Sequence, residues 1–201
     1  RNSIPYRIIG GIKFYQRKEI KDIVAYLRLI NNFSDKVSLE RIINEPKRGI
    51  GEITLGSWIN LSAEQGVNCI DFAAQISNLK SQISNKSQSA SWQTNFKIRD
   101  SKLDSIIKFS EFITRMSELK NKLPIIDFIQ KVYTESRYEK FLLDGTEEGE
   151  MRHENVQELL TVAQKYEEYE GEERLNLFLE EIALASDTDN VDQNKESVHL
   201  M

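Results

Sequence analysis

Two glycines and two cations lie together in one short segment whose composition is hard to explain by packing alone. Lys47 and Arg48 come directly before Gly49, and a single aliphatic residue, Ile50, separates Gly49 from Gly51. A glycine pair permits positive φ and lets backbone N–H groups approach another molecule with no Cβ in the way. If a helix begins just after Gly51, its free N–H groups and positive dipole end form an anion site beside the two cations. The pattern therefore predicts phosphate binding.

A structural role for the same glycines stays open. Glycine after a helix is often only a C-cap, and a lone Gly-x-Gly pattern is weak evidence for any ligand. The neighbouring elements decide which interpretation the chain favours.

Helical patterns precede and follow the glycine pair. Apolar residues at helical spacing predict a helix over residues 17–32, and Ser38 is suited to N-cap a short helix through residue 43 that ends before Pro46. A further helix is expected over residues 53–64, with Thr54 in its first turn. The order of helix, tight hairpin and helix is the layout of a helix-hairpin-helix element, which holds duplex phosphates without reading bases.

The rest of the chain predicts a mainly α fold. Helices are expected over residues 70–79, 103–119, 124–133, 138–142, 151–169 and 174–185, with Pro124 at the first helical position of its helix. Two polar stretches interrupt these patterns. Residues 80–95 predict an exposed loop, which Trp92 and Phe96 anchor to the core, and residues 144–149 predict a solvated acidic turn. The acidic turn has a composition that suits a hard cation but lacks the ligand spacing of a calcium loop.

Composition narrows the class of protein. The chain has 201 residues, 39% of them hydrophobic and 29% charged, and no run is long enough for a membrane span, so a soluble protein is expected. The net charge of −5 means that contact with nucleic acid requires a local basic patch. A single cysteine, Cys69, suits a reducing cytoplasm, and the isolated His153 and His199 offer no metal cluster. We therefore expect no catalytic, cofactor or metal site within the chain.

The two ends of the chain predict short strands. Residues 6–9 form a β-type run before a glycine pair, residues 198–201 form a second, and the polar residues 186–197 predict a flexible connection between the helices and that second run. The simplest account is a helical body inserted into a sheet domain, so we expect the sequence to be a fragment of a longer protein.

Several segments resemble the superfamily 1A DNA helicases of the UvrD, PcrA and Rep type. The segments are IPYRIIGGIKFYQRKEIKD at residues 4–22, VAYLRL at 24–29, RIINEPKRGIG at 41–51, RHENVQEL at 152–159 and VHLM at 198–201. They occur in the order that the family has, whereas residues 80–101 match no family motif.

The resemblance implies that the chain is the 2B subdomain, a helical insertion in the second RecA-like domain. It divides the chain into residues 1–16, which belong to RecA-like domain 2A, the 2B body at 17–185, and a return to 2A at 186–201. In such helicases the RecA-like domains bind ATP and Mg²⁺ and move 3′ to 5′ along single-stranded DNA in repair or replication. The chain has no Gly-x-x-x-x-Gly-Lys-Ser/Thr phosphate loop, so the fragment alone is expected to be inactive.

The leading hypothesis is a regulatory subdomain that contacts duplex DNA at a junction of single and double strands. The predicted DNA-binding residues are Lys47, Arg48, Gly49, Ile50, Gly51 and Thr54. If both cations neutralise a phosphate, changing both to Ala flattens the log–log salt dependence of duplex binding by about 2 units. The helicase's own RecA-like domains and repair proteins are further expected partners.

Two alternatives remain. One is a helical protein-interaction module with a purely structural glycine turn, which the acidic net charge favours because it repels DNA. The other is a free-standing enzyme, for which the sequence offers no nucleophile and base set, metal spacing or carboxylate pair.

Overall fold

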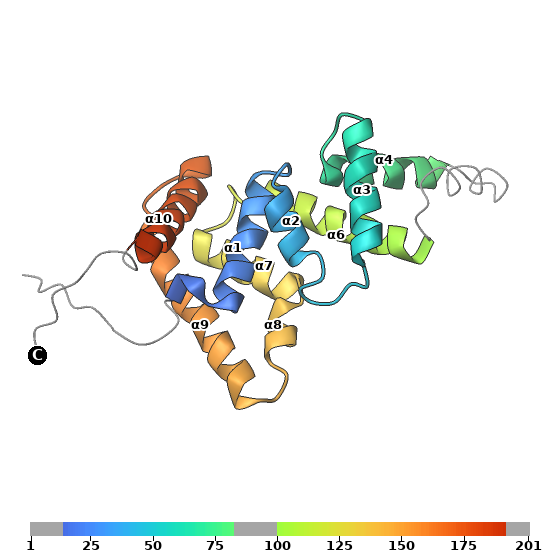
Figure 1. The fold of residues 1–201 in the computed structure, drawn as a ribbon. Helices are drawn as coiled ribbons and strands as arrows, with labels where there is room; N and C mark the ends of the chain where they lie inside the picture. Colours follow the sequence, from blue (N-terminus) through green and yellow to red (C-terminus); the bar gives the residue numbers. More distant parts are fainter. Residues whose placement is uncertain (1–13, 83–99, 192–201) are drawn as a thin grey trace, which may run out of the picture.

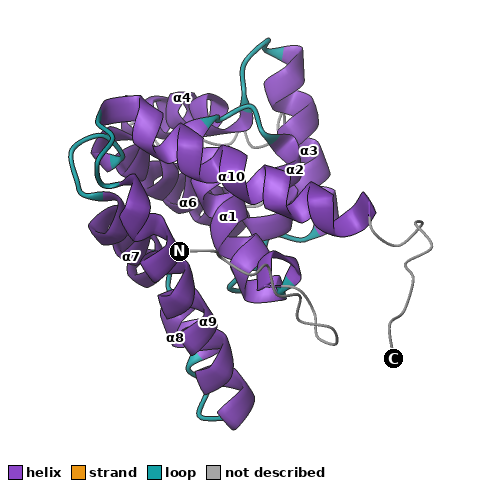
Figure 2. Cartoon of the chain, turned by 90° about the vertical axis from the view of Figure 1, so that its left-hand side faces the viewer, coloured by secondary structure: helices purple, strands orange, loops and turns teal. Residues whose placement is uncertain are grey.

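The computed structural model describes residues 14–82 and 100–191 of the chain. Every regular element in these residues is a helix (Figure 2), which confirms the predicted mainly α fold. The elements are η1 (Phe14–Gln16), α1 (Lys18–Asn31), α2 (Lys36–Ile42), α3 (Glu52–Glu64), α4 (Cys69–Gln82), α6 (Asp100–Leu119), α7 (Ile125–Glu135), α8 (Tyr138–Leu142), α9 (Glu147–Ala163), η2 (Gln164–Tyr166) and α10 (Gly171–Val191).

Helix α1 lies at the centre of the fold (Figure 1). Its apolar side chains are buried on most sides, and it packs against α2, α6, α7, α9 and α10. A helix that is buried on most of its surface needs neighbours all around it, and these five supply them. Helix α1 is therefore the central helix of the core, and these five helices surround it.

Helices α3 and α4 form an outer pair beside α6 (Figure 1). Trp58 of α3 is fully buried, and its indole Nε1 donates a hydrogen bond to the Cys69 carbonyl at 3.0 Å. This contact fixes α3 on α4, and α4 in turn packs on α6. Helix α3 is thus attached to α6 through α4.

Helix α8 and the first part of α9 lie side by side and extend beyond the other helices (Figure 2), whereas α9 as a whole also packs on α1 and α7. None of the helices within residues 14–82 and 100–191 is both long and apolar enough to cross a membrane.

Three predicted helix starts differ from the structure, and in two of them, α2 and α9, a polar side chain caps the helix before the apolar pattern begins. Asp35, not Ser38, is the N-cap of α2: its carboxylate accepts the Ser38 N–H at 3.0 Å and the Ser38 hydroxyl at 2.6 Å. Pro124 is the N-cap of α7 and not its first residue. Thr146 caps α9, so the last residues of the predicted acidic turn are its first helical turn, where glutamates complement the helix dipole.

Helix lengths also differ from the sequence-based ranges. Helix α4 continues to Gln82 and α10 to Val191, so both enter stretches that were predicted to be a loop or a flexible connection. Helix α9 ends at Ala163 and gives way to a 3₁₀ turn before residue 169. The predicted strands at 6–9 and 198–201, and the proposed anchors Trp92 and Phe96, lie outside the described residues.

Candidate nucleic-acid interface

The glycine pair lies in the loop of residues 43–51, which joins α2 to α3. Helix α2 packs on α1, whereas α3 packs on α4, so the loop connects two parts of the helical body (Figure 1). The tight helix-hairpin-helix geometry that was predicted is not confirmed. The expected helix after Gly51 is present, and it begins at Glu52 with Gly51 as its N-cap.

Asn44 closes this loop upon itself. Its side-chain oxygen accepts the N–H groups of Arg48 at 3.3 Å and Ile50 at 3.1 Å, and its amide nitrogen donates to the Ile50 carbonyl. One side chain thereby replaces the hydrogen bonds that a regular ladder would provide. The loop is held in one shape before any ligand arrives.

Ile50 is buried, whereas the glycines on both sides of it, Gly49 and Gly51, are exposed. The Ile50 side chain pins the loop to the core. Gly49 has a φ of +70°, a conformation that favours glycine. A Cβ added at Gly51 would meet no atom within 4 Å, so the space in front of the helix start is open. The backbone of both glycines is therefore accessible to a ligand.

Arg48 points into the protein. Its Nη1 donates to three backbone carbonyls at 3.0 to 3.2 Å, and its Nη2 donates to the Tyr26 hydroxyl at 2.6 Å and to the Ser136 carbonyl at 3.2 Å. The three carbonyls are those of Ile42, Ile43 and Pro46. The guanidinium carbon also lies 5.0 Å from the centre of the Phe109 ring, within the range of a cation–π contact. Arg48 thus joins the loop to α1, α6 and the α7–α8 turn.

The Tyr26 hydroxyl extends this hydrogen-bond network to Glu45. It donates to the Glu45 carbonyl at 2.6 Å while accepting from Arg48. Burial raises the pKa of Tyr26 to about 12, so the phenol keeps its proton at neutral pH and remains a donor.

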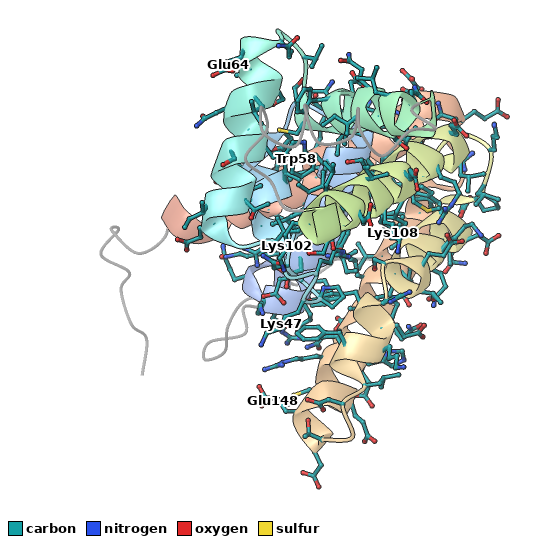
Figure 3. The ribbon with its side chains drawn as sticks, turned by 90° about the vertical axis from the view of Figure 1, so that its right-hand side faces the viewer. Lys47, Trp58, Glu64, Lys102, Lys108 and Glu148 are labelled. Atoms are coloured by element: carbon teal, nitrogen blue, oxygen red, sulfur yellow. The ribbon has the colours of Figure 1, made fainter. Side chains whose placement is uncertain are left out.

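Two lysines carry the accessible positive charge at the loop. Lys47 is exposed, and Lys102 of α6 lies so close that a Cβ added at Gly49 would be 2.9 Å from its Nζ. Figure 3 shows Lys47 and Lys102 on one face together with Lys108, while Glu64 and Glu148 lie at the far ends of that face. Lys102 could not be predicted from the sequence, because it belongs to a helix that is remote in the chain and carries no local motif. Only the fold brings it to Gly49.

The first turn of α3 contains a polar, an acidic and an exposed apolar side chain. Thr54 is half-buried, Glu52 places an exposed carboxylate at the helix start, and Ile53 is 89% exposed. A hydroxyl contact from Thr54 to a ligand stays a prediction.

The described residues contain no group of three or more His, Cys, Asp or Glu side chains that could hold a metal ion. This arrangement is suited to binding an oxyanion, because the helix-start amide N–H groups and the Lys102 ammonium lie at an exposed backbone and Lys47 is exposed in the same loop.

The residues that the structure describes form a helical body with a basic glycine turn, and comparison with known proteins gives the family of the chain. The UvrD-like helicase C-terminal domain matches residues 1–201, so the chain belongs to this family and the resemblance noted in the sequence is confirmed.

Two similar proteins are DNA helicases by name. The chain is 33% identical to the ATP-dependent DNA helicase PcrA of Bacillus subtilis over 195 residues, which is 96% of the chain and 24% of that protein. It is 31% identical to DNA helicase II of Haemophilus influenzae over 207 residues, which is 100% of the chain and 26% of that protein. The chain therefore spans about a quarter of the length of these relatives.

Proposed function

We propose that this chain is a regulatory subdomain of an ATP-dependent 3′-to-5′ DNA helicase and that it contacts duplex DNA near a junction with single-stranded DNA. The observation that carries the proposal is the exposed backbone of Gly49 and Gly51, with the Lys102 amine close to Gly49 and the exposed Lys47 two residues before it in the chain. Backbone N–H groups and lysines bind phosphates whatever the base sequence, so the contact grips DNA without reading it.

The residues of the loop divide into two roles. Lys47, Lys102 and the backbone of both glycines are the phosphate-contacting groups, with Thr54 as a further donor. Ile50 and Arg48 hold the loop in shape, because the first is buried and the second is occupied by protein acceptors. This assignment replaces the direct phosphate contact that the sequence predicted for Arg48.

Catalysis belongs to other parts of the longer protein that we infer. The relatives are named as ATP-dependent DNA helicases, and this chain carries no phosphate-loop pattern, so ATP and Mg²⁺ would bind elsewhere. RecA-like domains of the same protein and repair proteins remain proposed partners, and a cytoplasmic location remains a prediction.

Gly51→Asp tests the proposal without unfolding the protein. The position has room for a side chain, and Asp is a favourable N-cap, so α3 keeps or gains stability while a carboxylate occupies the anion site. Gln65→Glu, at the other end of α3, adds the same charge away from the loop and serves as the control. We expect Gly51→Asp to weaken binding of a labelled duplex at least tenfold in low salt and Gln65→Glu to change it less than twofold. Equal binding by both variants and the parent chain contradicts the proposal.

A second function has a specific observation in its favour. Ile53 is 89% exposed directly beside the loop, and Phe141, Leu143 and Met151 are exposed near the end of the α8–α9 pair. Exposed apolar side chains are typical of protein interaction sites. If neither the parent chain nor Gly51→Asp binds duplex, a helical interaction module with a structural glycine turn is the better account.

A further inference from the structure

A groove lies beside the glycine loop, between that loop, α6 and the α7–α8 turn. Its volume is about 480 Å³. Charged residues that line it include Lys47, Arg48, Lys108, Arg115, Glu135 and Arg137. We propose that this groove is a second phosphate-binding surface, which takes the backbone of the same duplex that the glycine loop holds. The inference rests on the proposed function and extends its contact with DNA.

The groove has a charge opposite to that of the chain. Five cationic side chains and two carboxylates line it, although the chain as a whole has a net charge of −5. A concave surface lined mainly by one sign of charge focuses the electrostatic field and attracts a polyanion. The groove therefore supplies the local basic patch that an acidic protein requires for contact with DNA.

Both carboxylates of the groove are engaged by neighbours. Glu135 pairs with Lys131 at 2.7 Å and with Arg115 at 2.6 Å, and these hydrogen-bonded cations lower the pKa of its carboxyl. Glu111 accepts a hydrogen bond from the Ser77 hydroxyl at 3.3 Å. The negative charge of Glu135 is thus compensated by Arg115 of the groove and by Lys131 outside it.

Three cations of the groove remain available to a ligand. Lys47, Lys108 and Arg137 are exposed, and none of them forms an ion pair with another residue of the described ranges. They come from the loop, α6 and the α7–α8 turn, so they approach the groove from three sides. Figure 3 shows Lys47 and Lys108 on the same face of the molecule.

The walls of the groove are held together in advance. Arg48 donates to loop carbonyls and to the Ser136 carbonyl, so one side chain ties the loop to the residue that precedes Arg137. Ser136 is itself buried, and its hydroxyl donates to the Tyr133 carbonyl at 3.0 Å. Arg137 then leaves this fixed turn with a φ of 65°. A preformed site loses little conformational freedom when a ligand binds.

The double variant Lys108→Gln/Arg137→Asn tests the groove. Asn tolerates positive φ, so the turn is retained while the charge is removed. If each cation neutralises one phosphate, the log–log slope of duplex affinity against salt flattens by about 2 units, and binding in low salt weakens. Lys36→Gln/Lys122→Gln removes two exposed charges outside the groove and should leave the slope within about 0.5 unit of the parent chain. Circular dichroism melting checks that all variants are folded.

The results of these titrations distinguish failure of the proposed groove from failure of the proposed glycine-loop contact. An unchanged slope in the groove variant, together with weakened binding by Gly51→Asp, overturns the groove and leaves the proposed function intact. Absence of duplex binding by the parent chain overturns both. Titration with inorganic triphosphate adds a third arm: if the groove variant loses triphosphate binding but keeps the duplex slope, the groove holds a free polyphosphate and the inference is wrong.

Discussion

Lys47 and Arg48 are neighbours with the same charge, yet their side chains have different surroundings. Lys47 is exposed at the edge of the groove, whereas the Arg48 guanidinium is surrounded by protein acceptors and lies against an aromatic ring. A planar guanidinium presents several donors in a fixed fork, which suits a site with several carbonyls. At the scale of one residue, Lys47 is therefore suited to bind a ligand and Arg48 to position the loop.

Arg48→Lys separates these roles. A lysine amine cannot reach the acceptors on both sides of the guanidinium, so several of them lose their donor, and we expect the free energy of unfolding to fall by about 2–4 kcal/mol. Lys47→Ala is the matched control, with an expected change within about 0.5 kcal/mol because its side chain is exposed. Urea unfolding followed by circular dichroism measures both. Equal stability of Arg48→Lys and Lys47→Ala would remove the positioning role.

Polar side chains join the helices on which the family resemblance rests. Asn155 of α9 accepts from Arg17 at the start of α1 and donates to the buried Glu19 carboxylate at 2.6 Å. Asp22 of α1 lies 2.7 Å from Arg41 Nε and accepts the Tyr138 hydroxyl at 2.6 Å. These contacts connect the segments at residues 4–22 and 152–159, so at the scale of elements those motifs hold α1 against its neighbours.

Tyr138→Phe should have a pH-dependent effect on stability. Burial raises the pKa of Asp22 above its usual 3.8, while the Tyr138 hydrogen bond opposes that rise. The folded protein therefore loses stability as Asp22 ionises with rising pH, and it loses more without the hydroxyl. We expect the destabilisation by Tyr138→Phe to be about 1 kcal/mol larger at about pH 7 than at about pH 3.5.

Urea unfolding at the two pH values measures this difference. Tyr169→Phe is the control, because the Tyr169 hydroxyl makes no hydrogen bond to another residue of the described ranges, and its effect should not vary with pH. A Tyr138→Phe effect that is the same at both pH values contradicts a charged Asp22 as the acceptor.

For the molecule as a whole, apolar periodicity predicted the helices well and their ends poorly. The pattern of Ile20, Ile23 and Leu27 is enough to place α1, because burial decides that helix. The starts of α2 and α9 were misplaced because Asp35 and Thr146 act through hydrogen bonds that the apolar pattern does not contain.

The candidate site was predictable only in part. The Lys-Arg-Gly-Ile-Gly segment pointed to the loop, and Gly51 does begin a helix. Its chemistry depends on contacts between distant segments: Arg48 meets Ser136, and Lys102 meets Gly49. No local pattern reports such contacts, so the division of roles in the loop and the groove beside it emerged only from the fold.

If the glycine loop binds duplex phosphates independently of base sequence, the salt dependence of duplex binding must change in Lys47→Gln/Lys102→Gln. Each phosphate contact contributes about 0.9 to the log–log slope, so the double variant should flatten that slope by about 2 units, equally for duplexes of unrelated sequence. If the double variant retains the slope of the unsubstituted chain, Lys47 and Lys102 do not bind duplex phosphates.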